Sequence, residues 1–212
     1  MIEAQERRSY RIDVVSTVLL AVTAVAIAWT AAQVTRWRDT HSSHSTKATV
    51  AHIEASRAFT RAGAETQVDI ATFIQWVDAN AAGDHKLATF YRRRFRPEFS
   101  PAFAAWLKMK SLTNPESLPT PFAMPEYRVK EAARSDQLIT LAGLQTKESR
   151  KALKTADDYL FALVLFATAL FFAGISTKIP SLGPREVLLA IGWVIFLGAA
   201  VWVATLPVTL SL

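Results

Sequence analysis

The sequence predicts an all-α integral membrane protein with three transmembrane helices and a helical stalk and cap inserted between the first and second spans. The 212-residue chain is 51% apolar and contains three long runs without charge. Each run can cross a hydrocarbon core of about 30 Å at about 1.5 Å per residue. Lipid offers backbone groups no water, so each run must be a helix. The long segment between the first two runs has helical spacing and no strand alternation.

The three runs define the predicted spans. The first, residues 14–34, follows an N-terminal tail, residues 1–13, that contains three arginines. It is longer than the roughly 7–15 residues of a secretory signal core, so we expect a retained anchor. The second span is predicted at 159–177 and the third at 187–208, with the short loop 178–186 between them.

Charge in the short connections predicts the orientation. The N-terminal tail has three arginines and the loop 178–186 has Lys178 and Arg185, whereas the C-terminal tail has no charge. Cytoplasmic loops carry an excess of Lys and Arg, so we expect the N-terminus in the cytoplasm and residues 35–156 outside it. The reverse orientation is the alternative, because residues 35–156 also carry cations beside both of their membrane ends.

The segment 35–156 predicts a hairpin of stalk helices. Alanines are frequent at 48–64, where a helix continues from the first span, and the sequence is charged and alanine-rich again from 129 to 156. Between them, Asp84 is placed as the N-cap of a helix over 85–95, which Pro97 stops. Length supports only a small helical cap at the tip.

The cap sequence continues with a second short helix and a strap. Ser100 is predicted as an N-cap with Pro101 at the first helical position. Phe103 and Trp106 share one face of this helix. The segment 114–125 is rich in proline, so we expect an extended strap there without regular structure.

Several long stretches of the chain resemble a widespread family of uncharacterised bacterial three-span membrane proteins. They are WTAAQVTRW, DIATFIQWVDA, FYRRRFRPEFSPAFAAWL, NPESLPTPFAMPEY and LFFAGIST. The resemblance covers nearly the whole chain and implies the three-span architecture and a bacterial plasma (inner) membrane. It implies no catalytic or binding residue. The chain departs from the family where Trp29-Thr30-Ala31-Ala32-Gln33 lacks the tyrosine usual at the end of the first span.

Three histidines follow the first span on one helical face: His41, His44 and His52. His41 and His44, at i and i+3, could contribute a partial zinc or copper site. Around the axis of an oligomer, the three could instead respond to pH. The alternative is a solvated start of the stalk, which the neighbouring serines favour.

A polar stripe runs along the first span at near-heptad spacing, and its members are Asp13, Ser16, Thr23, Thr30 and Gln33. In a membrane such a stripe marks a helix–helix packing seam or the wall of a pore. Serine and threonine hydroxyls can also bond to carbonyls of their own helix and imply nothing further.

Two charged clusters complete the candidate sites. Arg92, Arg93, Arg94 and Arg96 alternate with aromatic side chains and could contact anionic lipid or an acidic partner, or could form a solvated face. Asp157 and Asp158 stand at the start of the second span. The helix dipole favours acids there, and a ring of them in an oligomer would attract cations.

The chain contains no cysteine, and we find no catalytic or nucleic-acid-binding motif in it. We therefore expect no enzyme, no cofactor and no nucleic-acid partner. The expected function is a homo-oligomeric membrane protein that forms a pore or channel-like assembly, with the first span near the axis. The alternative is a structural or accessory subunit whose cap binds another membrane protein or an anionic surface. Membrane lipids are partners in both cases.

Overall fold

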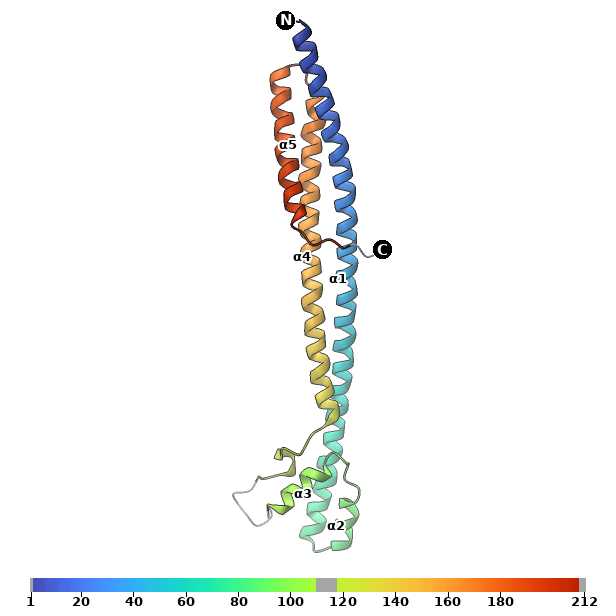
Figure 1. Ribbon diagram of the computed structural model, residues 1–212. Helices are drawn as coiled ribbons and strands as arrows, with labels where there is room; N and C mark the ends of the chain where they lie inside the picture. Colours follow the sequence, from blue (N-terminus) through green and yellow to red (C-terminus); the bar gives the residue numbers. More distant parts are fainter. Residues whose placement is uncertain (1, 110–117, 210–212) are drawn as a thin grey trace. The chain divides into compact units, whose positions relative to one another are not determined.

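The computed structural model describes residues 2–109 and 118–209, and these residues form helices and no strand. In chain order the elements are α1 (Ile2–Ala81), α2 (His85–Arg92), α3 (Ser100–Lys108), the 3₁₀ turn η1 (Pro121–Ala123), α4 (Lys130–Ser176) and α5 (Leu182–Ala204) (Figure 1). The predicted all-α class is confirmed. Helices α1, α4 and α5 are each long and apolar enough to cross a membrane.

The chain divides into two compact units. The bundle unit combines Met1–Thr46 with Thr146–Leu212, and the cap unit is Lys47–Gln145. Helices α1 and α4 contribute to both units. Neither helix contains a proline, so no missing N–H interrupts its hydrogen-bond ladder, and the first two predicted spans continue unbroken into the stalk sequences.

Several predicted boundaries shift in the structure. Helix α5 ends at Ala204 rather than at 208, because Pro207 has no backbone N–H and disfavours helical geometry in the residue before it. The prediction for Ser100 is wrong: Phe99 occupies the N-cap, and the Ser100 hydroxyl donates to the Arg96 carbonyl at 3.1 Å. Asp84 is confirmed as the α2 N-cap, since its carboxylate accepts from the Leu87 N–H at 2.9 Å.

The connection between α1 and α2 depends on one glycine. Gly83 has a φ of 73°, a left-handed conformation that side chains with a Cβ disfavour. It lies between the end of α1 at Ala81 and the N-cap Asp84, so the chain reverses there in a few residues. Of the predicted strap, residues 118–125 are described and include η1, while Pro115 lies outside the described residues.

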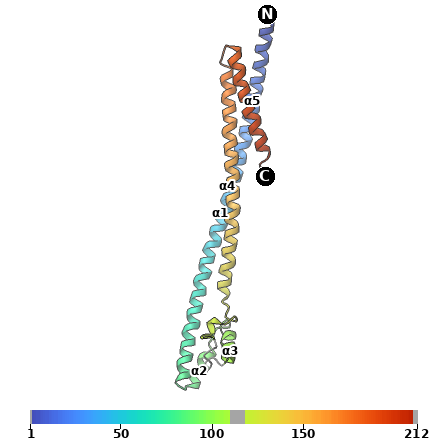
Figure 2. The same ribbon diagram turned by 90° about the vertical axis from the view of Figure 1, so that its left-hand side faces the viewer.

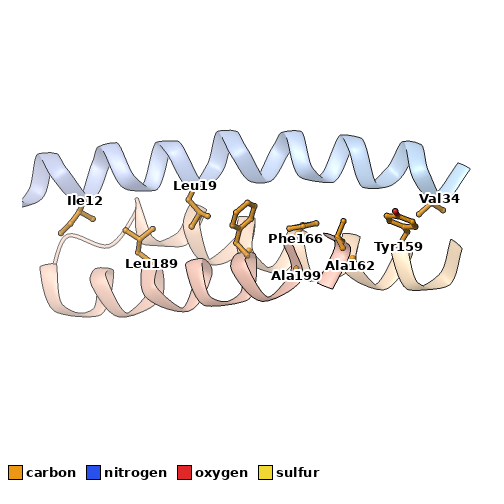
Figure 3. Close-up of a cluster of buried hydrophobic side chains, with 12 residues drawn as sticks. Ile12, Leu19, Val34, Tyr159, Ala162, Phe166, Leu189 and Ala199 are labelled. Carbon is orange, nitrogen blue, oxygen red and sulfur yellow. The ribbon is translucent and has the colours of Figure 1, made fainter. Parts of the chain in front are cut away.

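The bundle unit packs α1, α4 and α5 around one apolar core. Figure 3 shows side chains from the three helices meeting, with Leu19 of α1, Phe166 of α4 and Leu189 of α5 among the buried members. Gly192 of α5 permits a close approach, because an added Cβ would lie 3.3 Å from Leu19 Cδ2. Small residues at such crossings are the usual means of tight packing between membrane helices.

The cap unit has a seam of small residues between α1 and α4. On α1 the buried members are Ala48, Ala51, Ala55, Ala58 and Ala62. On α4, Ser135 and Ala142 are also buried. The Ser135 hydroxyl donates across the seam to the Ala55 carbonyl at 3.1 Å. The alanine-rich composition predicted helices here, and the structure shows that these alanines are also buried.

An aromatic core holds the rest of the cap unit together, where α2 and α3 lie beside the C-terminal end of α1 (Figure 2). Its buried rings come from α1, α3 and the turn before α3: Trp76, Phe95, Phe99, Phe103 and Trp106. The indole N–H of Trp106 donates to the Leu118 carbonyl at 2.9 Å and so attaches the strap to this core. Most of the ring contacts are edge-to-face, such as that of Trp76 with Phe103, whose ring centres are 4.7 Å apart.

Candidate functional site

The polar stripe of α1 lies in the interior of the bundle unit. Ser16, Thr23 and Thr30 are fully buried, and Gln33 is 2% exposed. The Ser16 hydroxyl donates to the Ile12 carbonyl at 2.8 Å and lies 3.4 Å from the hydroxyl of Ser176 on α4. The neighbours that exclude solvent from the stripe belong to the same chain.

Within the stripe, the two threonines differ in their hydrogen bonding. The Thr30 hydroxyl donates to the Ala26 carbonyl at 2.6 Å, one turn back along its own helix. The Thr23 hydroxyl is buried and has no hydrogen-bond partner among the described residues. A water-lined wall would satisfy such a group at once, whereas a dry helix contact leaves it unsatisfied.

Polar contacts close both ends of the stripe. At one end Asp13 forms an ion pair with Arg185, a residue at the start of α5 that is almost completely buried. At the other end the Gln33 carbonyl oxygen accepts from the backbone N–H of Thr209 at 3.3 Å and from its hydroxyl at 3.2 Å. Sequence reasoning used Arg185 only as a sign of orientation and assigned no contact to Thr209.

The C-terminal stretch after α5 is fixed by three further donors. The indole of Trp37 and the hydroxyl of Tyr159 both donate to the Pro207 carbonyl, at 3.2 Å and 3.1 Å. The Arg36 guanidinium donates to the Thr209 carbonyl at 2.9 Å. Arg36, Trp37 and Tyr159 thus attach the chain beyond α5 to α1 and α4.

The histidines do not form one cluster of side chains. His41 lies in the bundle unit, where its Nδ1 is 2.8 Å from the Ser149 hydroxyl of α4. His44 is half-buried in the same unit, and His52 is exposed in the cap unit. The part of the chain that the structure describes contains no group of three or more metal-ligating side chains placed to hold an ion.

The acids at the start of the second span differ in their surroundings. Asp157 is exposed. Asp158 is half-buried and borders an open hollow of about 550 Å³, which is also lined by Trp37, Lys151 and Lys154. Lys151 is already paired with Glu148 at 2.7 Å. The hollow therefore has charges of both signs and no excess that selects a particular ion.

The four arginines of the cap divide into two groups. Arg92, Arg93 and Arg94, which we call the arginine row, are exposed and make no ion pair with the described residues. The Arg92 guanidinium lies 6.0 Å from the ring centre of Phe103, and that of Arg94 lies 3.5 Å from Phe90. These ring contacts hold Arg92 and Arg94 in place without neutralising them.

Arg96, in contrast, is used inside the cap unit. Its guanidinium bonds to Asp69 at 2.9 Å and to Glu65 at 2.6 Å, and it lies 3.5 Å from Glu98. Three carboxylates surround this one cation, and Lys130 adds a second cation 3.3 Å from Glu98. Arg96 is therefore committed to internal ion pairs, unlike the three exposed arginines.

Asp69 is the fully buried carboxylate of this network. Its Oδ2 accepts hydrogen bonds from Arg96 and from the hydroxyl of Tyr127 at 3.1 Å, while Oδ1 has no partner among the described residues. Burial raises the pKa of Asp69, and the bonds from Arg96 and Tyr127 oppose that rise. Burial likewise raises the pKa of Tyr127.

Sequence reasoning missed Asp69 and Tyr127 as a pair. Asp69 interrupts an apolar stretch at Val68–Ile70, where an acid at a core position is a signal for a partner cation. Tyr127 lies just after the predicted strap, and no contact was assigned to it. No rule of spacing connects either residue to Arg96, because the three come from α1, the connection between η1 and α4, and the turn before α3.

Comparisons of the chain with protein-family models, with curated proteins and with solved structures gave no match. What the protein does must therefore follow from its side chains and their surroundings.

Proposed function

We propose that the protein is a non-enzymatic accessory subunit of a larger membrane complex. Helices α1, α4 and α5 anchor it in the membrane, and its cap binds an anionic partner through the arginine row. The bundle unit supplies the anchor and the cap unit supplies the binding surface. The observation that carries the proposal is the contrast between Arg96, which three carboxylates surround, and the exposed row Arg92–Arg94, which pairs with no carboxylate among the described residues.

An unpaired cluster of guanidinium groups favours an anionic partner. Arginine is always charged near neutral pH and offers several fixed N–H donors to carboxylate or phosphate oxygens. Like charges at three successive positions also repel one another, and an anion relieves that repulsion. The neighbouring acid Glu98 does not fill this role, since it is bound to Arg96 and Lys130.

The packing beneath the row supports a binding role. Arg92 lies over Phe103, and Phe103 is 2% exposed in the aromatic core. A surface cation loses rotamer freedom when it binds, and a side chain already stacked on a fixed ring loses less. The cap therefore presents the row in a partly ordered arrangement.

The burial of the polar stripe favours the accessory-subunit hypothesis and argues against the pore hypothesis. A pore with the first span at its axis requires Ser16, Thr23 and Thr30 to face water, but each is fully buried within one chain. The stripe then serves to pack α1 against α4 and α5.

The proposal is tested by purification from native membranes. The wild-type chain and a variant with Arg92→Glu, Arg93→Glu and Arg94→Glu are solubilised in mild detergent, and their bound material is compared by mass spectrometry. We expect the variant to lose an acidic protein or anionic lipid that the wild type retains. A control variant, Arg57→Glu with Arg61→Glu, reverses two exposed arginines of α1 and should retain it. Identical bound material in all three samples contradicts the proposal.

We further propose that copies of the chain associate. Several large apolar side chains of the cap unit remain exposed, including Phe59 at 72%, Val68 at 53% and Ile74 at 50%. Isolated exposed apolar side chains are ordinary on a protein surface, but their number here supports a covering neighbour. Native mass spectrometry of the detergent-held particle distinguishes a closed oligomer from a monomer, and a monomer contradicts self-association.

A further inference from the structure

Helix α2 carries exposed apolar side chains directly beside exposed cations. Leu87 is 41% exposed and Phe90 is 45% exposed, and Lys86, Arg93 and Arg94 are exposed as well. Spacings of three, four and seven residues place them on the same side of one helix and its C-terminal turn. We call these five residues the α2 patch.

Phe90 and Arg94 form the centre of the patch. The Arg94 guanidinium lies 3.5 Å from the Phe90 ring centre, and its Nη1 donates to the Phe90 carbonyl at 3.5 Å. One face of the guanidinium is therefore covered by the ring, while its outer edge keeps free N–H groups. The pair therefore presents an apolar ring next to a charged guanidinium edge on the protein surface.

We propose that the α2 patch docks on the surface of a bilayer that contains anionic phospholipids. Leu87 and Phe90 enter the level of the headgroups, and Lys86, Arg93 and Arg94 contact phosphate oxygens. Apolar side chains next to cations are the usual composition of segments that lie in a membrane interface. This inference rests on the proposed function and names its anionic partner.

The size of the patch favours lipid over an acidic protein. A stable protein interface needs about 20–30 residues on each side, and a helix of eight residues supplies far fewer. A bilayer needs no complementary shape, and each cation near an anionic surface strengthens binding by about fivefold. Three cations and two apolar side chains are then enough for reversible attachment.

A flotation experiment with the full chain tests the inference. The chain is held in nanodiscs of phosphatidylcholine and mixed with vesicles of phosphatidylcholine, with or without phosphatidylglycerol. We expect co-flotation only with the phosphatidylglycerol vesicles, and we expect it to weaken as salt is added because salt screens the attraction. Binding that is equal on both kinds of vesicle overturns the inference.

Two variants identify the patch. Arg93→Glu with Arg94→Glu should weaken vesicle binding by at least about 25-fold, as two favourable contacts are lost. Phe90→Ala keeps every charge and should weaken it by about fivefold, because the apolar contribution is lost. The control Arg57→Glu with Arg61→Glu makes the same change of net charge on α1 and should bind as the wild type does.

The outcomes separate this inference from the proposed function. If the chain ignores anionic vesicles, but reversing the arginine row still removes an acidic protein from native membranes, the lipid inference is overturned and the proposed function stands. If the control weakens vesicle binding as much as Arg93→Glu with Arg94→Glu, net charge alone drives attachment and the patch is refuted. Unchanged ellipticity of each variant establishes that its loss of binding is not unfolding.

Discussion

Replacing Thr23 by valine should stabilise the bundle. The Thr23 side chain is fully buried and its hydroxyl has no hydrogen-bond partner among the described residues. Valine has nearly the same shape and the same branching at Cβ, so the change removes a hydroxyl and leaves the packing intact. Few substitutions inside a packed helix bundle should raise stability, which makes this one informative.

The magnitude follows from the cost of an unsatisfied buried group. Leaving a buried hydroxyl without a partner costs about 1–3 kcal/mol, so Thr23→Val should raise the unfolding free energy by about 1 kcal/mol. Thr30→Val is the matched control. Its hydroxyl donates to the Ala26 carbonyl at 2.6 Å, so the same chemical change there should lower stability by about 0.5–1 kcal/mol.

Unfolding by sodium dodecyl sulfate in mixed micelles, followed by tryptophan fluorescence, measures both variants against the wild type. Opposite signs for the two substitutions are the predicted result. If Thr23→Val lowers the unfolding free energy as much as Thr30→Val does, the Thr23 hydroxyl is satisfied by water or by another chain. The assignment of the polar stripe to a dry seam would then be refuted.

Other perturbations give further predictions. Gly192→Ala should be about 1 kcal/mol less stable than Gly198→Ala in the same assay, because the new Cβ at 192 meets a leucine side chain and a backbone carbonyl. Both changes gain the helix propensity of alanine, and Gly198 has open space around it, so Gly198→Ala should not lower stability. Arg96→Ala should lower the unfolding free energy by about 3 kcal/mol, because it leaves the buried carboxylate of Asp69 without its cation. Arg93→Ala should change the unfolding free energy by less than about 0.5 kcal/mol. Equal stability of the two variants would contradict the assignment of Arg96, and not Arg93, to the internal ion pairs. Since burial raises the pKa of Asp69, the folded cap binds that proton more tightly than the unfolded chain does, and stability should fall as the pH rises from the ordinary aspartate pKa toward the raised one. Denaturation at a series of pH values should show this slope in the wild type and lose it in Asp69→Asn.

Sequence patterns predicted the helices of this chain well, because the signals for them are local. The three apolar runs require helices by length and by the absence of water in lipid. The N-cap Asp84 also needs only its neighbours, since its carboxylate accepts from an N–H three residues on. The errors at Ser100 and at the end of α5 are shifts of a few residues, where several residues compete for one boundary.

The contacts between distant parts of the chain could not be predicted in the same way. A polar stripe on one helix is compatible with a pore and with a packing seam, and only the positions of α4 and α5 distinguish them. The four cap arginines look alike in sequence. Arg96 differs from Arg93 because the fold brings Asp69 and Glu65 to it across about thirty residues of chain. Long-range ion pairs of this kind leave no periodic signal.

Labelling of single cysteines measures whether the polar stripe is dry. The chain contains no cysteine, so Thr23→Cys and Arg93→Cys each introduce one thiol into an otherwise unreactive background. The variants are kept in open membrane fragments, in which both faces of the bilayer are accessible, and are treated with a membrane-impermeant maleimide. We predict rapid labelling of Arg93→Cys, which is exposed, and none of Thr23→Cys, which is sealed among α1, α4 and α5. Rapid labelling of Thr23→Cys would place water along the first span and would contradict the proposal that this span is packed within its own chain.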